Sequence, residues 1–94
     1  MRLSEEEIST LKAGLRELDD EARLYLFGSR ADDSRRGGDI DLIIISRKLD
    51  KKQIRVLRHR FYEKFGEQKV DIIIDNGDKR DPFVKRIFPQ AVPL

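Results

Sequence analysis

The first apolar pattern in the chain has a helical period. Within residues 4–18 the apolar side chains recur every three or four positions: Ile8, Leu11, Leu15 and Leu18. Ser4 is followed three residues later by Glu7, the signature of a capping box in which each side chain accepts a hydrogen bond from the other residue's backbone N–H. We therefore predict an amphipathic helix over residues 4–18, followed by a polar break at residues 19–21.

Three short runs favour β-strands instead. Residues 23–27 are β-prone and stop at a glycine. Residues 40–46 are rich in β-branched side chains and nearly all apolar, which is typical of a central strand covered on both faces. Residues 70–74 form the third run, closed by the turn-prone pair Asn76-Gly77. We expect three strands, of which the second is the most buried.

Two more helices are indicated in the second half of the chain. One opens at Leu49-Asp50 and ends at Gly66, a residue suited to a C-cap. Its apolar stripe consists of Ile54, Leu57, Phe61 and Phe65. The last helix is short, with Asp81 as its N-cap and Pro82 as its first residue. We expect one side of it to pack on the protein through Phe83, Val84, Ile87 and Phe88, before Pro89 and Pro93 end it.

The element order α-β-β-α-β-α predicts an α+β fold (mixed α/β), with a small mixed three-stranded sheet flanked by helices. The helix after the second strand can cross over and make the second and third strands parallel neighbours. The loop between the first two strands makes that pair antiparallel. Because the chain has 94 residues and no repeat, linker or low-complexity tract, we interpret residues 1–94 as a single domain.

Composition narrows the classes of function. The 20 basic residues are nearly balanced by 18 acidic ones, so the net charge of +2 does not indicate nucleic acid as the main partner. The absence of cysteine and the single His59 exclude a cysteine or histidine zinc site. Since no apolar run approaches the roughly 20 residues of a membrane span, and the N-terminus lacks a signal-peptide core, we expect a cytoplasmic protein without membrane contact.

Three aspartates occupy positions where a charge is unexpected. Asp39 and Asp41 flank Ile40 at the start of the most apolar strand, and residues two apart on a strand point to the same face. Asp71 lies inside the apolar run of the third strand, which we expect to be the neighbour of the second. Like charges brought together need a cation, and three convergent carboxylates suit two divalent metals roughly 3.5–4 Å apart.

A polar turn precedes this strand. Gly28 lets the backbone approach a ligand, and the Ser29 hydroxyl with nearby N–H groups can hold phosphate oxygens. Arg30 can add positive charge to a triphosphate or pair with one of the aspartates, and we leave both roles open. Arg35 or Arg36 could also reach the triphosphate, but we interpret these two residues, together with Asp32 and Asp33, as part of a solvated loop. The pattern predicts a phosphate cradle beside a metal platform.

Gly28-Ser29, nine residues and then Asp39-Ile40-Asp41 reproduce a known signature. It resembles the Gly-Ser-x9-Asp-x-Asp motif of the DNA polymerase β-like nucleotidyltransferase superfamily. Residues 26–31 and 39–42 are similar to its small bacterial and archaeal members, the minimal nucleotidyltransferases (MNT). Asp71 falls where this family places its third carboxylate. The similarity is good over residues 24–74 and loose over residues 81–94.

The resemblance implies a nucleotidyltransferase fold and a role for each residue. Asp39 and Asp41 would bind two Mg²⁺ ions, with Mn²⁺ as a substitute, and Asp71 would complete the site and help to activate an acceptor hydroxyl. Ser29 would contact the triphosphate of ATP or another NTP, and pyrophosphate would be released. Gly38 departs from the serine that many relatives have there, but this change removes no ligand.

The resemblance also implies a partner. Members of this size often pair with a helical HEPN-type toxin, a ribonuclease, in toxin–antitoxin modules. There the minimal nucleotidyltransferase is the antitoxin and silences the toxin by adding AMP to a tyrosine or by binding it. Larger relatives carry extra domains that hold the acceptor, so we expect a partner to present it here. A homo-oligomer is left open.

Several alternatives remain at this point. The third carboxylate is assigned to Asp71 rather than Asp75, which borders a turn. The basic positions of the second helix are interpreted as a solvated face: Arg55, Arg58, His59 and Arg60. The apolar residues of the last segment, 83–94, either close the core or form a partner surface. A binding-only antitoxin and a transferase acting on RNA or a small molecule are the alternatives to protein modification.

Overall fold

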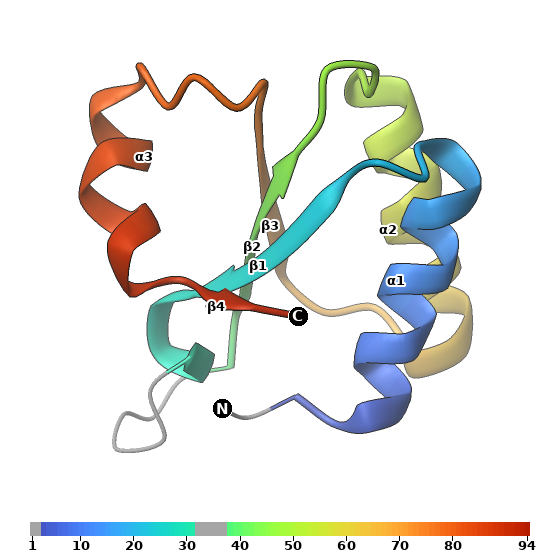
Figure 1. Ribbon diagram of the computed structural model, residues 1–94. Coiled ribbons are helices and arrows are strands. Elements are labelled where there is room, and N and C mark those ends of the chain that lie inside the picture. The colour runs from blue at the N-terminus through green and yellow to red at the C-terminus, as the bar shows by residue number, and fades with distance from the viewer. Residues whose placement is uncertain (1–2, 32–37) are drawn as a thin grey trace.

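The computed structural model describes residues 3–31 and 38–94. Along the described chain the elements are α1 (Glu5–Leu18), β1 (Arg23–Phe27), the 3₁₀ helix η1 (Gly28–Ala31), β2 (Ile40–Ile45), α2 (Lys51–Phe65), β3 (Val70–Asp75), α3 (Pro82–Ile87), the 3₁₀ helix η2 (Phe88–Gln90) and β4 (Val92–Pro93). Every predicted helix and strand is present, with ends that differ by one or two residues at most. The predicted α+β class is confirmed (Figure 1).

The helices begin and end where side chains satisfy their free backbone groups. Ser4 and Glu7 form the predicted capping box of α1, with both hydrogen bonds at 3.0 Å. Asp50 forms a second box with Gln53 at the start of α2, and its bonds are also 3.0 Å long. At the start of α3, the N-cap Asp81 accepts a hydrogen bond of 2.8 Å from the backbone N–H of Phe83, as predicted. Because these contacts are local, the start of each helix follows from its own sequence.

The sheet has the order β3-β2-β1-β4. The predicted directions are confirmed, since β1 and β2 are antiparallel, whereas β2 and β3 are parallel and joined by α2. The predicted number of strands was wrong, because β4 pairs with β1 at the edge of the sheet and makes four. A two-residue strand has no period to detect, and its Pro93 is tolerated because it lies at an edge.

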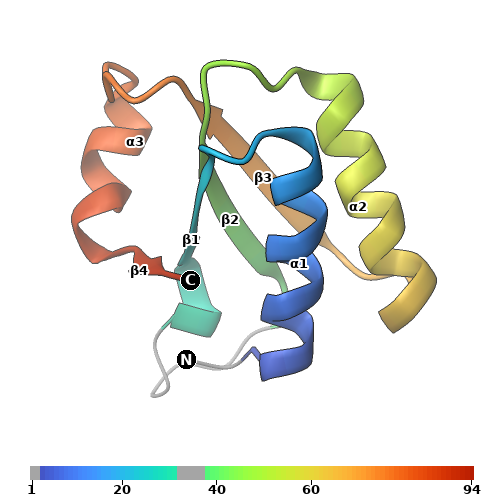
Figure 2. The same cartoon turned by 45° about the vertical axis from the view of Figure 1, so that its right-hand side comes forward.

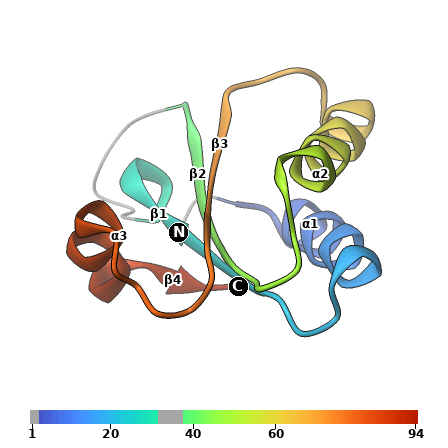
Figure 3. The same cartoon turned by 90° about the horizontal axis from the view of Figure 1, so that it is seen from above.

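The sheet separates two layers. Helices α1 and α2 lie side by side on one face, and α3 lies on the other (Figures 2 and 3). The main core fills the α1/α2 side and includes Leu24, Leu26, Ile40, Leu42 and Ile44 from the sheet, with Leu11, Leu15, Leu57 and Phe61 from the helices. Ile43 points to the other face and is fully buried there, so β2 is covered on both sides as its apolar run predicted.

Helix α3 and the segment after it close the second face of the sheet. Val84 is 1% exposed, and the ring of Phe88 packs edge-on against Tyr25 with centroids 4.8 Å apart. Phe83 also contacts a strand residue edge-on, Phe27 at 6.1 Å, but it remains 43% exposed. The last segment therefore completes the core, and Phe83 is the exception to the expected one-sided packing.

Candidate active site

The three predicted aspartates lie on one face of the sheet, at the beginning of β2 and β3. Asp41 and Asp71 are direct partners in the parallel register of these strands. Asp39 precedes β2 and is two residues from Asp41, which places it on the same face. The side chains of Asp39 and Asp71 are about half exposed, at 49% and 53%. Three carboxylates from two strands thus share one open face of the sheet.

Lys69 is a site residue that the sequence patterns did not indicate. Its ammonium lies 3.5 Å from Oδ2 of Asp39 and 3.9 Å from Oδ2 of Asp71. The side chain reaches both because it stands two residues before Asp71 and next to Asp39 across the strands. The sequence signal that could have indicated Lys69 is its position two residues before Asp71, on the same face of the strand. An exposed lysine next to a strand is common, however, so this position alone does not identify a site residue.

Asp41 is the most enclosed of the three carboxyl groups. Burial raises its pKa above the ordinary value of 3.8, and the negative charges of Asp71 and Asp39 raise it further, while Lys69 acts in the opposite direction. The direction and causes of this shift agree with the strand register. A divalent cation bound by these carboxylates would relieve the same repulsion, so the chemistry of the donor set fits one.

Gly28 explains how Asp41 fits beneath the turn after β1. It has a φ of +77°, in the left-handed region that favours glycine. A Cβ atom at this position would lie 2.5 Å from Oδ2 of Asp41, closer than van der Waals contact permits. The Gly28 backbone therefore lies close to the Asp41 carboxylate, and its approach to a ligand stays a prediction.

The rest of the predicted cradle is only partly described. Ser29 lies in η1, but its side chain is outside what the structure describes, and so are Arg35 and Arg36. Arg30 donates from Nη2 to the carbonyl oxygen of Gly38 at 3.0 Å. This bond links η1 to the residue before Asp39. Arg30 thus has a structural contact with the backbone, in addition to the two roles left open above, which were binding a triphosphate and pairing with an aspartate.

Asp75 has a different use from Asp71. It lies at the other end of β3, opposite Ile45, and is 8% exposed. Its Oδ2 accepts hydrogen bonds from the backbone N–H groups of Gly77 at 2.8 Å and Lys79 at 3.2 Å. Asp75 therefore holds the turn after β3, whereas Asp71 lies across from Asp41 at the beginning of the strand.

The described residues do not form a preassembled metal site. Within residues 3–31 and 38–94, no three aspartate, glutamate, histidine or cysteine side chains are grouped as ligands of one ion. Between Asp39 and Asp71 the nearby cation is the Lys69 ammonium. Some rearrangement of these side chains would accompany metal binding, and half-exposed carboxylates have room for it.

The basic residues of α2 take part in local structure. Arg58 donates from Nε to the carbonyl oxygen of Val70 at 3.1 Å and so ties α2 to β3, although we expected it on a solvated face. His59 pairs with Glu63 at 2.9 Å, and Arg60 pairs with Glu17 of α1. Arg55 is exposed, as predicted. Three of these four basic side chains therefore make contacts within the protein.

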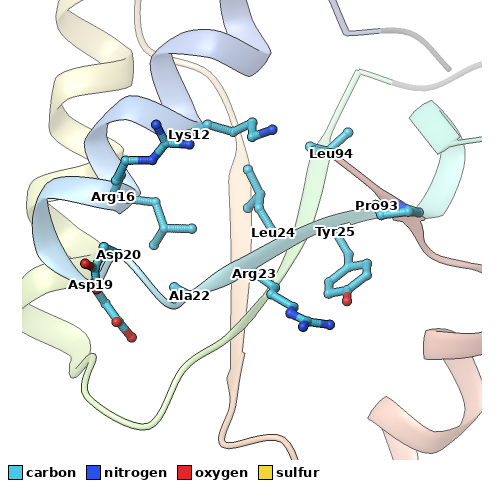
Figure 4. A pocket seen from close by; sticks show the side chains of 11 residues that line it. Lys12, Arg16, Asp19, Asp20, Ala22, Arg23, Leu24, Tyr25, Pro93 and Leu94 are labelled. Carbon is cyan, nitrogen blue, oxygen red and sulfur yellow. The ribbon is translucent and has the colours of Figure 1, made fainter.

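A separate hollow of about 340 Å³ lies between α1, β1 and the last residues of the chain. Lys12 and Arg16 of α1 line it together with Arg23 and Leu24 of β1 (Figure 4). It adjoins the beginning of β1, whereas Asp41 pairs with Phe27 at the end of that strand. This hollow is therefore separate from the three aspartates.

Throughout the part of the chain that the structure describes, no helix is long and apolar enough to cross a membrane.

Comparison with known proteins identifies the family. No curated protein matches the chain. The family model of the nucleotidyltransferase domain matches residues 8–93, from α1 to β4, and so includes all three aspartates. The chain therefore belongs to the nucleotidyltransferase domain family, the family of the minimal nucleotidyltransferases, and is a transferase of nucleotidyl groups.

Proposed function

We propose that this protein transfers AMP from ATP to a hydroxyl group of a partner protein, with Asp39, Asp41 and Asp71 holding two Mg²⁺ ions. One observation carries the proposal: Asp41 and Asp71 are register partners on neighbouring strands, and Asp39 shares their face. Such a set of carboxylates is costly to keep together without a function, as the raised pKa of Asp41 indicates.

The residues divide the chemistry among them. The new bond joins the acceptor oxygen to the α-phosphorus of ATP, while the bond from that phosphorus to the bridging oxygen breaks and pyrophosphate leaves. Asp71, at the exposed side of the group, accepts the proton of the acceptor hydroxyl. The turn at Gly28 and Ser29 holds phosphate oxygens, and bound divalent cations would stabilise charge on the attacking and leaving oxygens.

The openness of the site favours a macromolecular acceptor. The side chains of Asp39 and Asp71 are about half exposed, so a hydroxyl on the surface of another protein can reach them. We propose a tyrosine of a HEPN-type helical toxin as this acceptor, which makes the protein the antitoxin of a toxin–antitoxin pair. This assignment rests on the family resemblance together with the exposed site.

A transfer assay tests the proposal. The protein is incubated with α-labelled ATP, Mg²⁺ and the product of the neighbouring gene, and compared with Asp39→Asn. Asp20→Asn is the matched control, because Asp20 is exposed and lies in the turn before β1, at the opposite end of that strand from Asp41. We expect label on the partner with the wild type and the control, and a loss of at least roughly a hundredfold with Asp39→Asn.

Other outcomes select other functions. A stable complex with no label, in which Asp39→Asn still protects cells, would indicate an antitoxin that acts by binding alone. Label on RNA or on a small molecule in the absence of any protein partner would identify a different acceptor. Full transfer by Asp39→Asn would contradict the metal mechanism itself.

A further inference from the structure

Lys69 holds a defined position beside the carboxylates. Its carbonyl oxygen accepts a hydrogen bond of 3.1 Å from the backbone N–H of Ile40, which extends the β2–β3 ladder by one step. Lys69 therefore stands across from Asp39, as Asp71 stands across from Asp41. The four side chains form two adjacent cross-strand pairs on one face, three of them acidic and one basic.

The contacts of Lys69 are those of a counter-ion. The two ion pairs that these carboxylates make with described residues both come from its ammonium, at 3.5 Å to Asp39 and 3.9 Å to Asp71. Both distances are longer than that of a good hydrogen bond, so the ammonium pairs electrostatically with two carboxylates and is committed to neither. With 66% of its side chain exposed, Lys69 can leave at little cost.

We propose that Lys69 is a displaceable counter-cation that holds Asp39 and Asp71 together in the metal-free protein and competes with the divalent cation for them. The inference rests on the proposed function, because it assumes that these carboxylates bind metal. A bound divalent ion and the ammonium repel each other, so metal binding has to move Lys69 away from the carboxylates. Lys69 is thus a positioning residue that lowers the affinity of the site for metal.

Substitution of Lys69 by methionine tests this, because methionine keeps an unbranched side chain and removes the charge. Mn²⁺ binding is measured by electron paramagnetic resonance in the absence of nucleotide, and thermal unfolding is measured in EDTA. We expect Lys69→Met to bind Mn²⁺ about threefold to tenfold more tightly than the wild type, with a smaller difference at high salt. In EDTA its Tm should fall, since Asp39 and Asp71 then lack their counter-ion.

Two variants serve as controls. Lys64→Met makes the same change at an exposed lysine that pairs with Glu6 of α1 at 3.3 Å, away from the site, and should leave Mn²⁺ affinity unchanged. Lys69→Arg keeps the charge and should bind Mn²⁺ about as the wild type does. Unchanged or weaker Mn²⁺ binding by Lys69→Met, with normal binding by the wild type, would overturn the role of Lys69 alone.

The same measurements distinguish a failure of the proposed role of Lys69 from a failure of the proposed metal site. If the wild type binds Mn²⁺ and Asp41→Asn does not, the proposed metal site stands whatever Lys69 does. If the wild type binds no Mn²⁺, or if Asp39→Asn and Asp41→Asn bind it as well as the wild type, the metal site fails and the role of Lys69 fails with it.

Discussion

At the scale of single residues, the site depends on a contact between a backbone and a carboxylate. Gly28 provides the left-handed turn that ends β1, and the space left by its missing Cβ is filled by the carboxylate of Asp41. The signature pair Gly28-Ser29 is usually interpreted through the phosphate it would hold. Here the glycine has a second use, because it allows one of the proposed metal ligands to lie against the turn.

Replacing Gly28 by alanine should therefore affect transfer more than folding. The left-handed φ costs about 1 kcal/mol for a residue with a Cβ atom, which corresponds to a Tm loss of about 5 °C in a domain of this size. The new Cβ would also displace Oδ2 of Asp41, from which it would be 2.5 Å away. A shift of about 1 Å in a reacting group can reduce kcat by about a hundredfold, and we expect a loss of that order in the transfer assay.

Gly66→Ala is the matched control for this prediction. Gly66 ends α2 with a φ of +84°, and a Cβ atom there would meet nothing within 4 Å. Because its ψ of 161° lies in a region almost restricted to glycine, Gly66→Ala should lose at least as much Tm as Gly28→Ala and keep the wild-type rate of transfer. Equal rates for Gly28→Ala and Gly66→Ala would mean that the position of Asp41 does not matter for the reaction.

At the scale of elements, the parts that the sequence predicted are those determined by local contacts. The capping residues Ser4, Asp50 and Asp81 mark the helix starts because each bonds to a backbone group two or three residues away. β4 has only two residues and depends on pairing with β1, and the contacts of Lys69 exist only once β2 and β3 are in register. Neither feature leaves a period or a motif in the sequence.

Another contact of this long-range kind joins two connecting segments. The Ser46 hydroxyl donates to Oδ2 of Asp19 at 2.6 Å and accepts from the backbone N–H groups of Lys48 and Leu49 at 3.1 Å. Asp19 follows α1 and is 5% exposed, so the bond links the α1–β1 turn to the β2–α2 loop. The hydrogen bond from Ser46 and that from the Glu21 N–H hold the pKa of Asp19 below its ordinary value of 3.8.

Removal of this hydroxyl should make the stability of the protein less dependent on acid pH. A carboxyl group whose pKa is depressed in the folded state contributes stability above pH 3.8, and this contribution is lost as the pH falls through the folded-state pKa. Ser46→Ala should thus have a Tm several degrees below the wild type at pH 7. The two Tm values should approach each other below pH 3.8.

Thermal unfolding of both proteins across a pH series measures this effect. Ser9→Ala changes an exposed serine of α1 and should follow the wild type at every pH. A Tm difference between Ser46→Ala and the wild type that stays constant down to the lowest pH would show that the hydroxyl stabilises the loop without involving the Asp19 carboxylate.

At the scale of the whole molecule, the sheet that carries the three aspartates is covered on both faces. The α1/α2 layer buries the main core, and α3 lies on the opposite face of the sheet (Figure 3). By the alternation of side chains along β2, Asp41 points to the same face as α3. The sequence left two uses open for the segment 83–94, closure of the core or a surface for a partner. Val84 and Phe83 are adjacent in α3 and differ in exposure, at 1% and 43%, so they separate these uses.

Val84→Ala should lower the free energy of unfolding by about 2 kcal/mol, the transfer of two methyl groups plus the cavity that they leave, and the Tm by about 10 °C. Phe83→Ala should cost about 1 kcal/mol, less than Val84→Ala, because 43% of Phe83 is already exposed to water. If the exposed Phe83 ring contacts the partner, Phe83→Ala should weaken that complex without unfolding the protein. Denaturant unfolding and partner titration of both variants distinguish the two effects. A Val84→Ala variant as stable as the wild type would mean that α3 does not close the core, and the aspartate face would then depend on a partner for its cover.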